Sequence, residues 1–128
     1  MIAADTSTWI AFFEGDGGDD VELLDKALGD RQVLMVPIVL TELLSDSQIS
    51  ANVAESLKEL PMLEIKSGFW TRAGELRAKV LAKGRRGRLG DALIAQSCVD
   101  HGVPLLTRDR DFRAFAETAG LNLAIKHS

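Results

Sequence analysis

The chain has 128 residues, of which 46% are apolar and 27% are charged, so it is long enough to bury one hydrophobic core, and a second independent domain is excluded. Its longest uninterrupted apolar run, Val33 to Leu40, spans eight residues, far fewer than the roughly 20 that cross a bilayer, which excludes a membrane-spanning protein. The net charge of −4 combines residues 1–64, with a net charge of −10, and residues 65–128, with a net charge of +6, so binding to a polyanion stays open.

We expect residues 1–128 to form one domain in the cytoplasm. The first four residues carry no basic side chain and are followed by the acidic Asp5. A secretory or transit peptide would have basic residues here. The only cysteine, Cys98, can form no internal disulfide, which fits a reducing compartment.

The first half of the chain alternates apolar runs with amphipathic segments, which predicts strands followed by helices. Ser7 is a candidate cap for the first helix, and Pro37 stops the second strand and permits a helix after it. In chain order we expect a strand at 1–4, a helix after Ser7 that carries residues 9–13, a loop at 15–18, a helix at 19–29, a strand at 32–36 and a helix from 37 to about 45.

The second half continues this alternation. Apolar residues recur at helical spacing from residue 69 onward, and we expect Met62, Phe69 and Trp70 to lie in the core. Gly102 is a candidate left-handed helix cap. The expected elements are a helix at 50–60, a strand at 62–65, a helix over about 69–81, a turn at 84–88, a helix at 91–101, a strand at 103–106, a helix over about 111–119 and a terminal strand at 121–125.

The predicted strands favour one fold class. They are apolar throughout rather than alternating, and helices separate them, which indicates a parallel sheet covered on both faces. We therefore predict a three-layer α/β/α fold with a central, mostly parallel sheet. Because such sheets present ligands at the carboxyl ends of their strands, polar residues just after the strands are candidates for a functional site.

Four acidic residues occupy comparable positions near these strand ends. They are Asp5, after the first strand; Glu42, in the first turns of the helix after the second; Asp91, at the start of the helix that leads to the fourth; and Asp109, after the fourth. Taken singly, each has a structural explanation as a turn residue, a helix cap or a solvated helix residue. If the parallel sheet forms, all four lie at one edge of it.

Carboxylates gathered in one place repel each other. Two like charges about 5 Å apart at an effective dielectric constant near 20 cost roughly 3 kcal/mol, a large share of a typical domain stability of about 5–15 kcal/mol. A cation must neutralise such a cluster, or some members must hold a proton. Because no histidine or cysteine cluster accompanies the acids, the oxygen donors favour Mg²⁺ or Mn²⁺ over Zn²⁺. A site of this kind can activate water and bind a phosphate oxygen.

The densest positive charge lies between Arg72 and Arg88, where seven basic residues stand against one acid. A basic stretch beside a metal site indicates a nucleic-acid phosphodiester as substrate. The candidate RNA-binding residues are Lys83, Arg85, Arg86 and Arg88. The alternative is a solvated helix face that ends in a flexible turn.

The four acids stand in segments with a distinctive order. These segments are DTSTWI at 5–10, TELL at 41–44, GDALIA at 90–95 and LLTRDRDF at 105–112. Together they resemble the PIN-domain nucleases and, in size and spacing, the VapC toxins of type II toxin–antitoxin modules. The resemblance covers nearly the whole chain. Each motif alone is common, and their order is what makes the set specific.

This resemblance implies a Mg²⁺-dependent endoribonuclease, with Mn²⁺ able to substitute, that is usually a homodimer and is held inactive by a VapB-like antitoxin. By matching position, it implies that the catalytic metal site is formed by Asp5, Glu42, Asp91 and Asp109. It implies supporting roles for Ser7 and Thr107, through hydrogen bonds to a carboxylate or to water near the ion, and an outer position for Asp111. Water would attack the scissile phosphate in line, with the acids positioning the ion. The basic turn matches no family motif, so its contact with RNA is predicted from charge alone.

Two other functions stay open. A phosphatase or phosphoacceptor domain would use Asp5 as its nucleophile, but such sites have a second acid nearby, where this chain has Ala4, Thr6 and Ser7. A non-catalytic module that binds RNA or protein would keep the fold without the chemistry, and the presence of all four acids argues against it. The two histidines, at 101 and 127, are expected to be structural or solvated, and the sequence does not indicate which RNA is cleaved.

Overall fold

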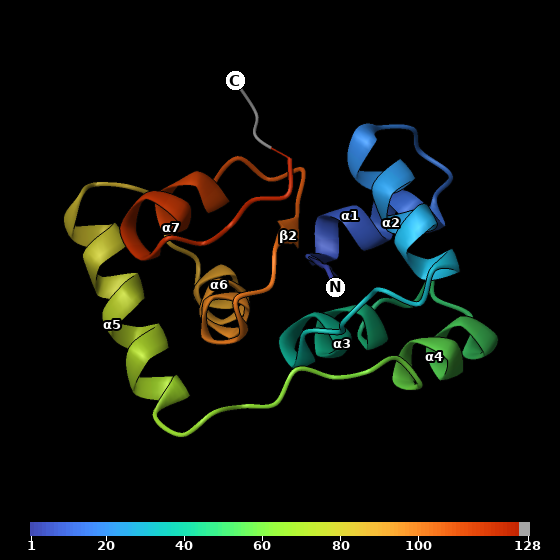
Figure 1. Ribbon diagram of the computed structural model, residues 1–128, viewed down its shortest axis with the longest axis horizontal. Coiled ribbons are helices and arrows are strands. Elements are labelled where there is room, and N and C mark those ends of the chain that lie inside the picture. The colour runs from blue at the N-terminus through green and yellow to red at the C-terminus, as the bar shows by residue number, and fades with distance from the viewer. Residues whose placement is uncertain (126–128) are drawn as a thin grey trace.

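The computed structural model describes residues 1–125 (Figure 1). Its elements in this range are β1 (Ala3–Ala4), α1 (Thr6–Phe13), α2 (Asp19–Gly29), α3 (Pro37–Leu44), α4 (Ala51–Lys58), α5 (Phe69–Ala82), α6 (Leu89–His101), β2 (Leu105–Leu106) and α7 (Phe112–Ala119). Every predicted helix is present, with ends that differ by a few residues at most. Within the described range, none of the helices is both long enough and apolar enough to cross a bilayer.

Local sequence explains several helix ends. Pro37 is the first residue of α3, where its missing N–H costs no helical hydrogen bond. Ser50 caps α4, because its side chain accepts a hydrogen bond from Val53 N at 3.2 Å. Gly102 follows α6 in the left-handed conformation, with φ 62°, and the predicted cap is confirmed.

The central sheet is parallel, as predicted. β1 pairs with β2, and Ala3 lies opposite Leu105 and Ala4 opposite Leu106. Single parallel bridges extend this pair on both sides, and they join Ile2 to Val33, Met35 to Met62, and Leu105 to Leu123. The first strand is therefore central, with the segments around 33–35 and 62 on one side of it and the segments around 105 and 123 on the other.

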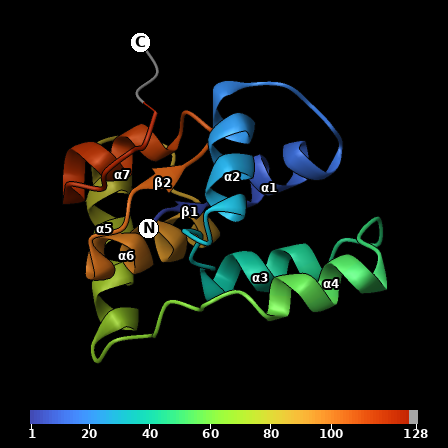
Figure 2. The same cartoon turned by 45° about the vertical axis from the view of Figure 1, so that its right-hand side comes forward.

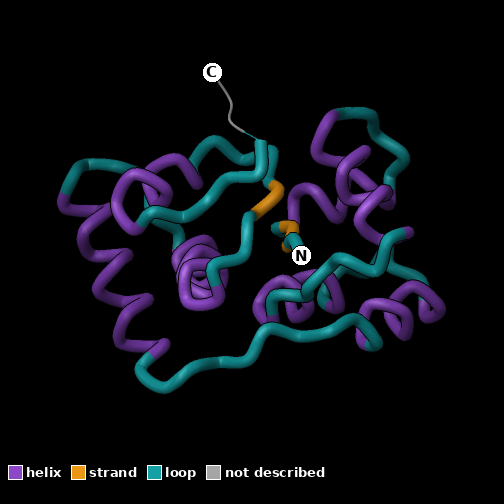
Figure 3. The backbone as a smooth tube through the Cα atoms, in the orientation of Figure 1, coloured by secondary structure: helices purple, strands orange, loops and turns teal. Residues whose placement is uncertain are grey.

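Several strands are shorter than the sequence suggests (Figure 3). The predictions for 32–36, 62–65 and 121–125 are wrong in length, because these segments contribute only isolated bridges. The helix that begins at Pro37 limits the first of them. The strand predicted at 103–106 is reduced to Leu105–Leu106, because Pro104 has no N–H to donate to a ladder.

Helices cover both faces of this small sheet. Figures 1 and 2 show α5, α6 and α7 together on one side and α1 to α4 on the other. Both residues of β1 and of β2 are buried between them, as are Trp9 of α1 and the phenylalanines at 112 and 115 of α7. This is the predicted three-layer arrangement, and it leaves the carboxyl ends of β1 and β2 next to each other.

Two of the predicted core residues are exposed. Phe69 is buried, but Met62 is 39% and Trp70 is 64% exposed, so their predicted core positions are wrong. Successive helical residues point about 100° apart, and the buried face of α5 continues from Phe69 through Ala73. Trp70 therefore points away from the core, and its ring packs edge-on against Phe69 with the ring centroids 4.9 Å apart.

Candidate metal centre

The candidate site begins where β1 and β2 end. Asp5 directly follows β1, and the segment 107–111 follows β2 and leads into α7. Asp5 N donates a hydrogen bond to Leu106 O at 3.0 Å. Two segments that are a hundred residues apart in the sequence are thereby held side by side, as parallel strand pairing predicts.

Asp5 is buried and closely held by its neighbours. It is 3% exposed, and its carboxylate accepts hydrogen bonds from Ser7 Oγ at 2.7 and 2.9 Å, from Thr107 Oγ1 at 2.6 Å and from Thr8 N at 3.1 Å. Burial raises the pKa of Asp5, although these hydrogen bonds act in the opposite direction. The bond from Thr8 N makes Asp5 the N-cap of α1, so the prediction that Ser7 caps this helix is wrong.

Three further carboxylates form a group of their own, and two of them, Asp91 and Asp109, interact electrostatically with Asp5. One oxygen each from Asp91, Asp109 and Asp111 lies within 4.8 Å of the other two. Asp109 N donates to Thr107 Oγ1, and Asp111 N donates to Asp109 Oδ1, both at 2.9 Å. These local bonds turn the 107–111 segment so that both of its aspartates face Asp91, which comes from the first turn of α6.

The carboxyl of Asp91 is strongly perturbed by its surroundings. Its pKa is raised to about 6, first by burial and then by the charges of Asp109 and Asp5, while the charge of Arg88 acts against the shift. Asp91 Oδ2 is among the buried side-chain atoms that have no hydrogen-bond partner in residues 1–125. α6 begins at Leu89, two residues before the predicted start, so Asp91 lies within the first turn rather than at its opening.

These residues fit a divalent cation. The grouped donors are all carboxylate oxygens, the donor type that Mg²⁺ and Mn²⁺ prefer. A buried carboxylate oxygen without a partner is costly, and Asp91 Oδ2 is such an atom. A cation at this point would supply the missing partner and offset the mutual repulsion of the aspartates.

Glu42 and Asp111 differ in placement from what the sequence suggests. Glu42 lies on the exposed side of α3 and outside the group of three, and its Oε1 accepts a hydrogen bond from Thr6 Oγ1 at 2.9 Å. Since Thr6 directly follows Asp5, this bond connects Glu42 to the rim of the site. Asp111, predicted as an outer residue, belongs to the group itself.

The basic turn between α5 and α6 lies against α7. Lys83 Nζ donates to Thr118 Oγ1 at 3.1 Å, and Arg85 pairs with Glu117 at 2.9 Å. Arg86 Nη1 lies 3.8 Å from Asp111 Oδ2. The four candidate RNA-binding residues, Lys83, Arg85, Arg86 and Arg88, are all exposed. The turn therefore places positive charge beside the acidic group.

The order of these elements and acids corresponds to a known family. The sequence profile of the PIN domain matches residues 2–118. The chain belongs to the PIN domain family. Ribonuclease VapC11 of Mycobacterium tuberculosis is 28% identical over 131 residues, which cover 97% of this chain and 98% of that protein. Ribonuclease VapC5 of the same organism is 25% identical over 125 residues, with 93% of this chain and 90% of that protein covered.

Solved structures share the fold of this PIN domain. A crystal structure of VapBC2 from Rickettsia felis, bound to a DNA fragment from its promoter, matches with a TM-score of 0.71 and 21% identity, and covers 99% of this chain and 100% of that one. A crystal structure of DNA-bound VapBC from Salmonella typhimurium matches with a TM-score of 0.68 and 20% identity. The match covers 96% of this chain and 97% of that one. The predicted three-layer α/β/α architecture is confirmed.

Two residues near the site are not indicated by the sequence pattern. The position of Asp20 in the sequence suggests only an acid at the start of a helix. In the structure it is 6% exposed and accepts hydrogen bonds from Arg108 and Thr8. The hydrogen bond from Arg108 is the main reason that the pKa of Asp20 is lowered to about 2. The signal in retrospect is Arg108 itself, a basic residue between Thr107 and Asp109 in the TRDRDF segment.

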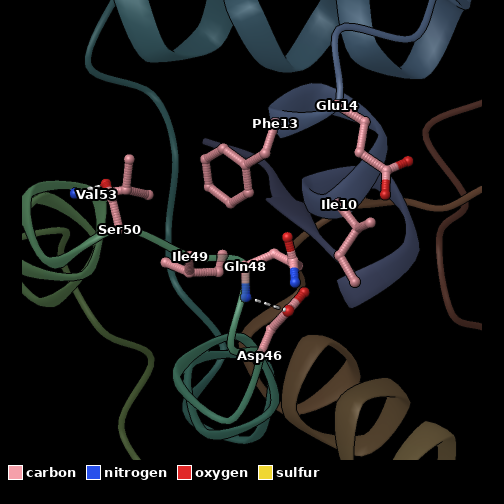
Figure 4. Close-up of a pocket in the computed structure, with 8 residues that line it drawn as sticks. All are labelled: Ile10, Phe13, Glu14, Asp46, Gln48, Ile49, Ser50 and Val53. Atoms are coloured by element: carbon pink, nitrogen blue, oxygen red, sulfur yellow. Dashed lines mark hydrogen bonds between the residues drawn. The ribbon is translucent and has the colours of Figure 1, made fainter.

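Three other features of residues 1–125 do not point to a second catalytic site. A pocket of about 230 Å³ between α1 and the start of α4 is lined by Phe13, Ile49 and their neighbours, and contains none of the candidate acids (Figure 4). Burial raises the pKa of Cys98 to about 12, so its thiol is a poor nucleophile. His101 Nε2 lies 2.7 Å from Glu64 O, in a backbone contact. His127 lies outside the described residues.

Proposed function

We propose that this PIN domain is a Mg²⁺-dependent endoribonuclease that hydrolyses RNA phosphodiester bonds, with Mn²⁺ able to substitute. The observation that carries the proposal is the group formed by Asp91, Asp109 and Asp111, in which one buried Asp91 oxygen has no partner within residues 1–125. The relatives that cover nearly all of the chain are named VapC ribonucleases, which supports an RNA-cleaving reaction.

The proposed ligands for the ion are the carboxylates of Asp5, Asp91 and Asp109. Glu42 contributes from the Thr6 side, and Asp111 from the side of the basic turn. When bound, a divalent cation would lower the pKa of water and neutralise charge on the scissile phosphate. Asp91 stands to gain from a cation, because burial and neighbouring charges raise its pKa and one of its buried oxygens has no hydrogen-bond partner within residues 1–125.

The chain's own residues position these groups. Ser7 and Thr107 hold Asp5 by hydrogen bonds to its carboxylate, and fixed ligands favour a productive arrangement over a mobile one. Arg86 and Arg88, exposed beside the acidic group, would bind substrate phosphates. Binding of this kind has little sequence preference and weakens with salt, so we assign these arginines to affinity rather than to the choice of RNA.

We further infer that the chain acts in the cytoplasm as a single-domain toxin, forms a homodimer and is inhibited by a VapB-like antitoxin. The support is that neighbours with the same fold are described as VapBC toxin–antitoxin structures, some of them bound to DNA. The test is to co-express the chain with any small DNA-binding protein encoded beside it. Co-purification of the two proteins and relief of growth arrest are expected, and toxicity that this neighbour does not affect would contradict the inference.

The enzymatic proposal is tested by RNA cleavage with single substitutions. Asp5→Asn and Asp91→Asn should each abolish Mg²⁺-dependent cleavage of single-stranded RNA, whereas Asp25→Asn, at an exposed position of α2, should leave it unchanged. The three variants are purified in the same way, so a contaminating nuclease would give the same background cleavage in each. Full cleavage by Asp91→Asn above that background would refute the site. RNA binding without cleavage by the unaltered protein would instead indicate a non-catalytic binding module.

A further inference from the structure

Arg108 forms a two-pronged ion pair with Asp20 at the start of α2. Arg108 Nε donates to Asp20 Oδ2 and Nη2 donates to Asp20 Oδ1, both at 2.8 Å. Nη2 also donates to Gly17 O, and Thr8 Oγ1 donates to Asp20 Oδ2, both at 2.9 Å. Paired hydrogen bonds of this kind fix the orientation of a guanidinium as well as its position.

The loop before α2 is shaped around this guanidinium. A Cβ atom at Gly18 would lie 2.8 Å from Arg108 Nη2 and 2.8 Å from Asp20 Oδ1. The φ of Gly18 is 138°, a conformation that L side chains rarely adopt. The side chain of Asp20 is 7% exposed, and a buried carboxylate is strongly destabilising without its partner. The Gly17 carbonyl and the Asp20 carboxylate therefore both use Arg108 as a donor, and the close approach of its guanidinium requires glycine at position 18.

Arg108 also stands between two residues of the candidate metal centre. On one side, Thr107 donates to Asp5 at 2.6 Å, and on the other, Asp109 N donates to Thr107 Oγ1 at 2.9 Å. Arg108 N itself donates to Ser7 Oγ at 3.3 Å. Consecutive Cα atoms are only 3.8 Å apart, so a displacement of Arg108 displaces the residues on both sides of it.

We propose that Arg108, clamped by Asp20, is a positioning residue of the metal centre that sets the place of segment 107–111 and hence of the Asp109 and Asp111 carboxylates. This inference rests on the proposed metal-dependent function. Arg108 acts through its chain neighbours, and loosening it would move ligand oxygens relative to Asp91. Loss of a group that orients metal ligands typically weakens metal affinity by about 10- to 100-fold.

The chain contains a matched control pair. Arg72 makes the same two-pronged contact with Asp100, whose side chain is 8% exposed, but Asp100 lies near the opposite end of α6 from Asp91. Arg108→Lys and Arg72→Lys each keep the positive charge and lose the paired geometry. Both variants should melt at a lower temperature than the unaltered protein, so stability alone does not separate them.

The deciding measurement is Mn²⁺ affinity, read from the electron paramagnetic resonance signal of free Mn²⁺ during titration of metal-free protein. We expect Arg108→Lys to raise the Kd about 10- to 100-fold and Arg72→Lys to change it less than about twofold. If Arg108→Lys does not fold, Asp20→Asn, which conserves side-chain size, takes its place in the same comparison.

Three other outcomes of the Mn²⁺ titration would each contradict the proposal, and each has a different meaning. Equal affinity in all three proteins would refute the clamp and leave the metal centre intact. An equal loss in Arg108→Lys and Arg72→Lys would show general loosening of the fold rather than positioning. Absence of Mn²⁺ binding by the unaltered protein would refute the metal centre and the clamp together.

Discussion

Replacing Asp91 by asparagine should stabilise the metal-free protein while removing its ability to bind a cation. The pKa of Asp91 is raised from 3.8 to about 6, first by burial and then by the charges of Asp109 and Asp5. At about 1.4 kcal/mol per pKa unit, this shift corresponds to ~3 kcal/mol. Screening by solvent at a partly exposed carboxylate reduces the expected gain to about 1–2 kcal/mol.

The sign of this effect depends on pH. Because the pKa of Asp91 is higher in the folded protein than in the unfolded chain, the associated stability is fully present below about pH 4 and is lost as the pH rises through about 6. At pH 7.5 the unaltered carboxylate is charged and repelled by its neighbours, whereas asparagine is neutral. At pH 4.5 most of this difference should disappear.

The assay is thermal unfolding of metal-free protein in chelator, with Asp25→Asn as the control for a general loss of acidic charge. We expect Asp91→Asn to raise Tm by about 4–8 °C at pH 7.5 and to have little effect at pH 4.5. Saturating Mn²⁺ should reverse the order, because ligand at 100 times its Kd stabilises the unaltered protein by about 2.7 kcal/mol. A lower Tm for Asp91→Asn in chelator at pH 7.5 would refute the proposed electrostatic strain.

Three further outcomes are expected. Thr107→Val removes a hydrogen bond to Asp5 and should weaken Mn²⁺ binding at least tenfold, as measured by calorimetric titration; unchanged affinity would contradict the supporting role. Replacing Arg86 and Arg88 together by glutamine should lower the slope of log affinity against log salt by about 1.4 for single-stranded RNA, as measured by fluorescence anisotropy, and an unchanged slope would remove these arginines from the interface. Cys98, 1% exposed and with a pKa raised to about 12, should resist iodoacetamide at pH 8 until denaturant is added; mass spectrometry that finds rapid labelling of the native protein would contradict its burial.

The proximity of Asp5 and Asp109 was predictable from the sequence, because it follows from strand order. Both residues follow apolar runs, and neighbouring parallel strands must end at the same edge of a sheet. Asp91 was predictable for a related reason, since it lies in the first turn of the helix that leads into the second of these strands. Short-range patterning is sufficient to place all three residues at one edge without any knowledge of side-chain packing.

Side-chain contacts between elements were not predictable in this way. The group includes Asp111 because the backbone of segment 107–111 turns on its own hydrogen bonds. Glu42 lies outside the group and accepts a hydrogen bond from Thr6. The pairing of Asp20 with Arg108 depends on how closely the loop at Gly18 approaches the guanidinium. The sequence marks Asp111 and Arg108 as polar residues of this segment, but which side chains they contact depends on the packed tertiary structure.

The strand lengths were overestimated for a different reason. Mostly apolar runs such as 32–36 have strand character, but a ladder also needs a partner at each residue and an N–H on each strand. Pro37 and Pro104 remove donors at the ends of two runs, and the segment at Met62 lies at the edge of the sheet. Composition thus indicates where a strand lies better than how far it extends.

Crystals grown with Mn²⁺ provide the most direct test of the central claim, that these carboxylates hold a divalent cation. An anomalous difference map should show a peak bonded to Asp91 Oδ2 and to an oxygen of Asp109. A map without a peak at these oxygens, from crystals in saturating Mn²⁺, would contradict the claim.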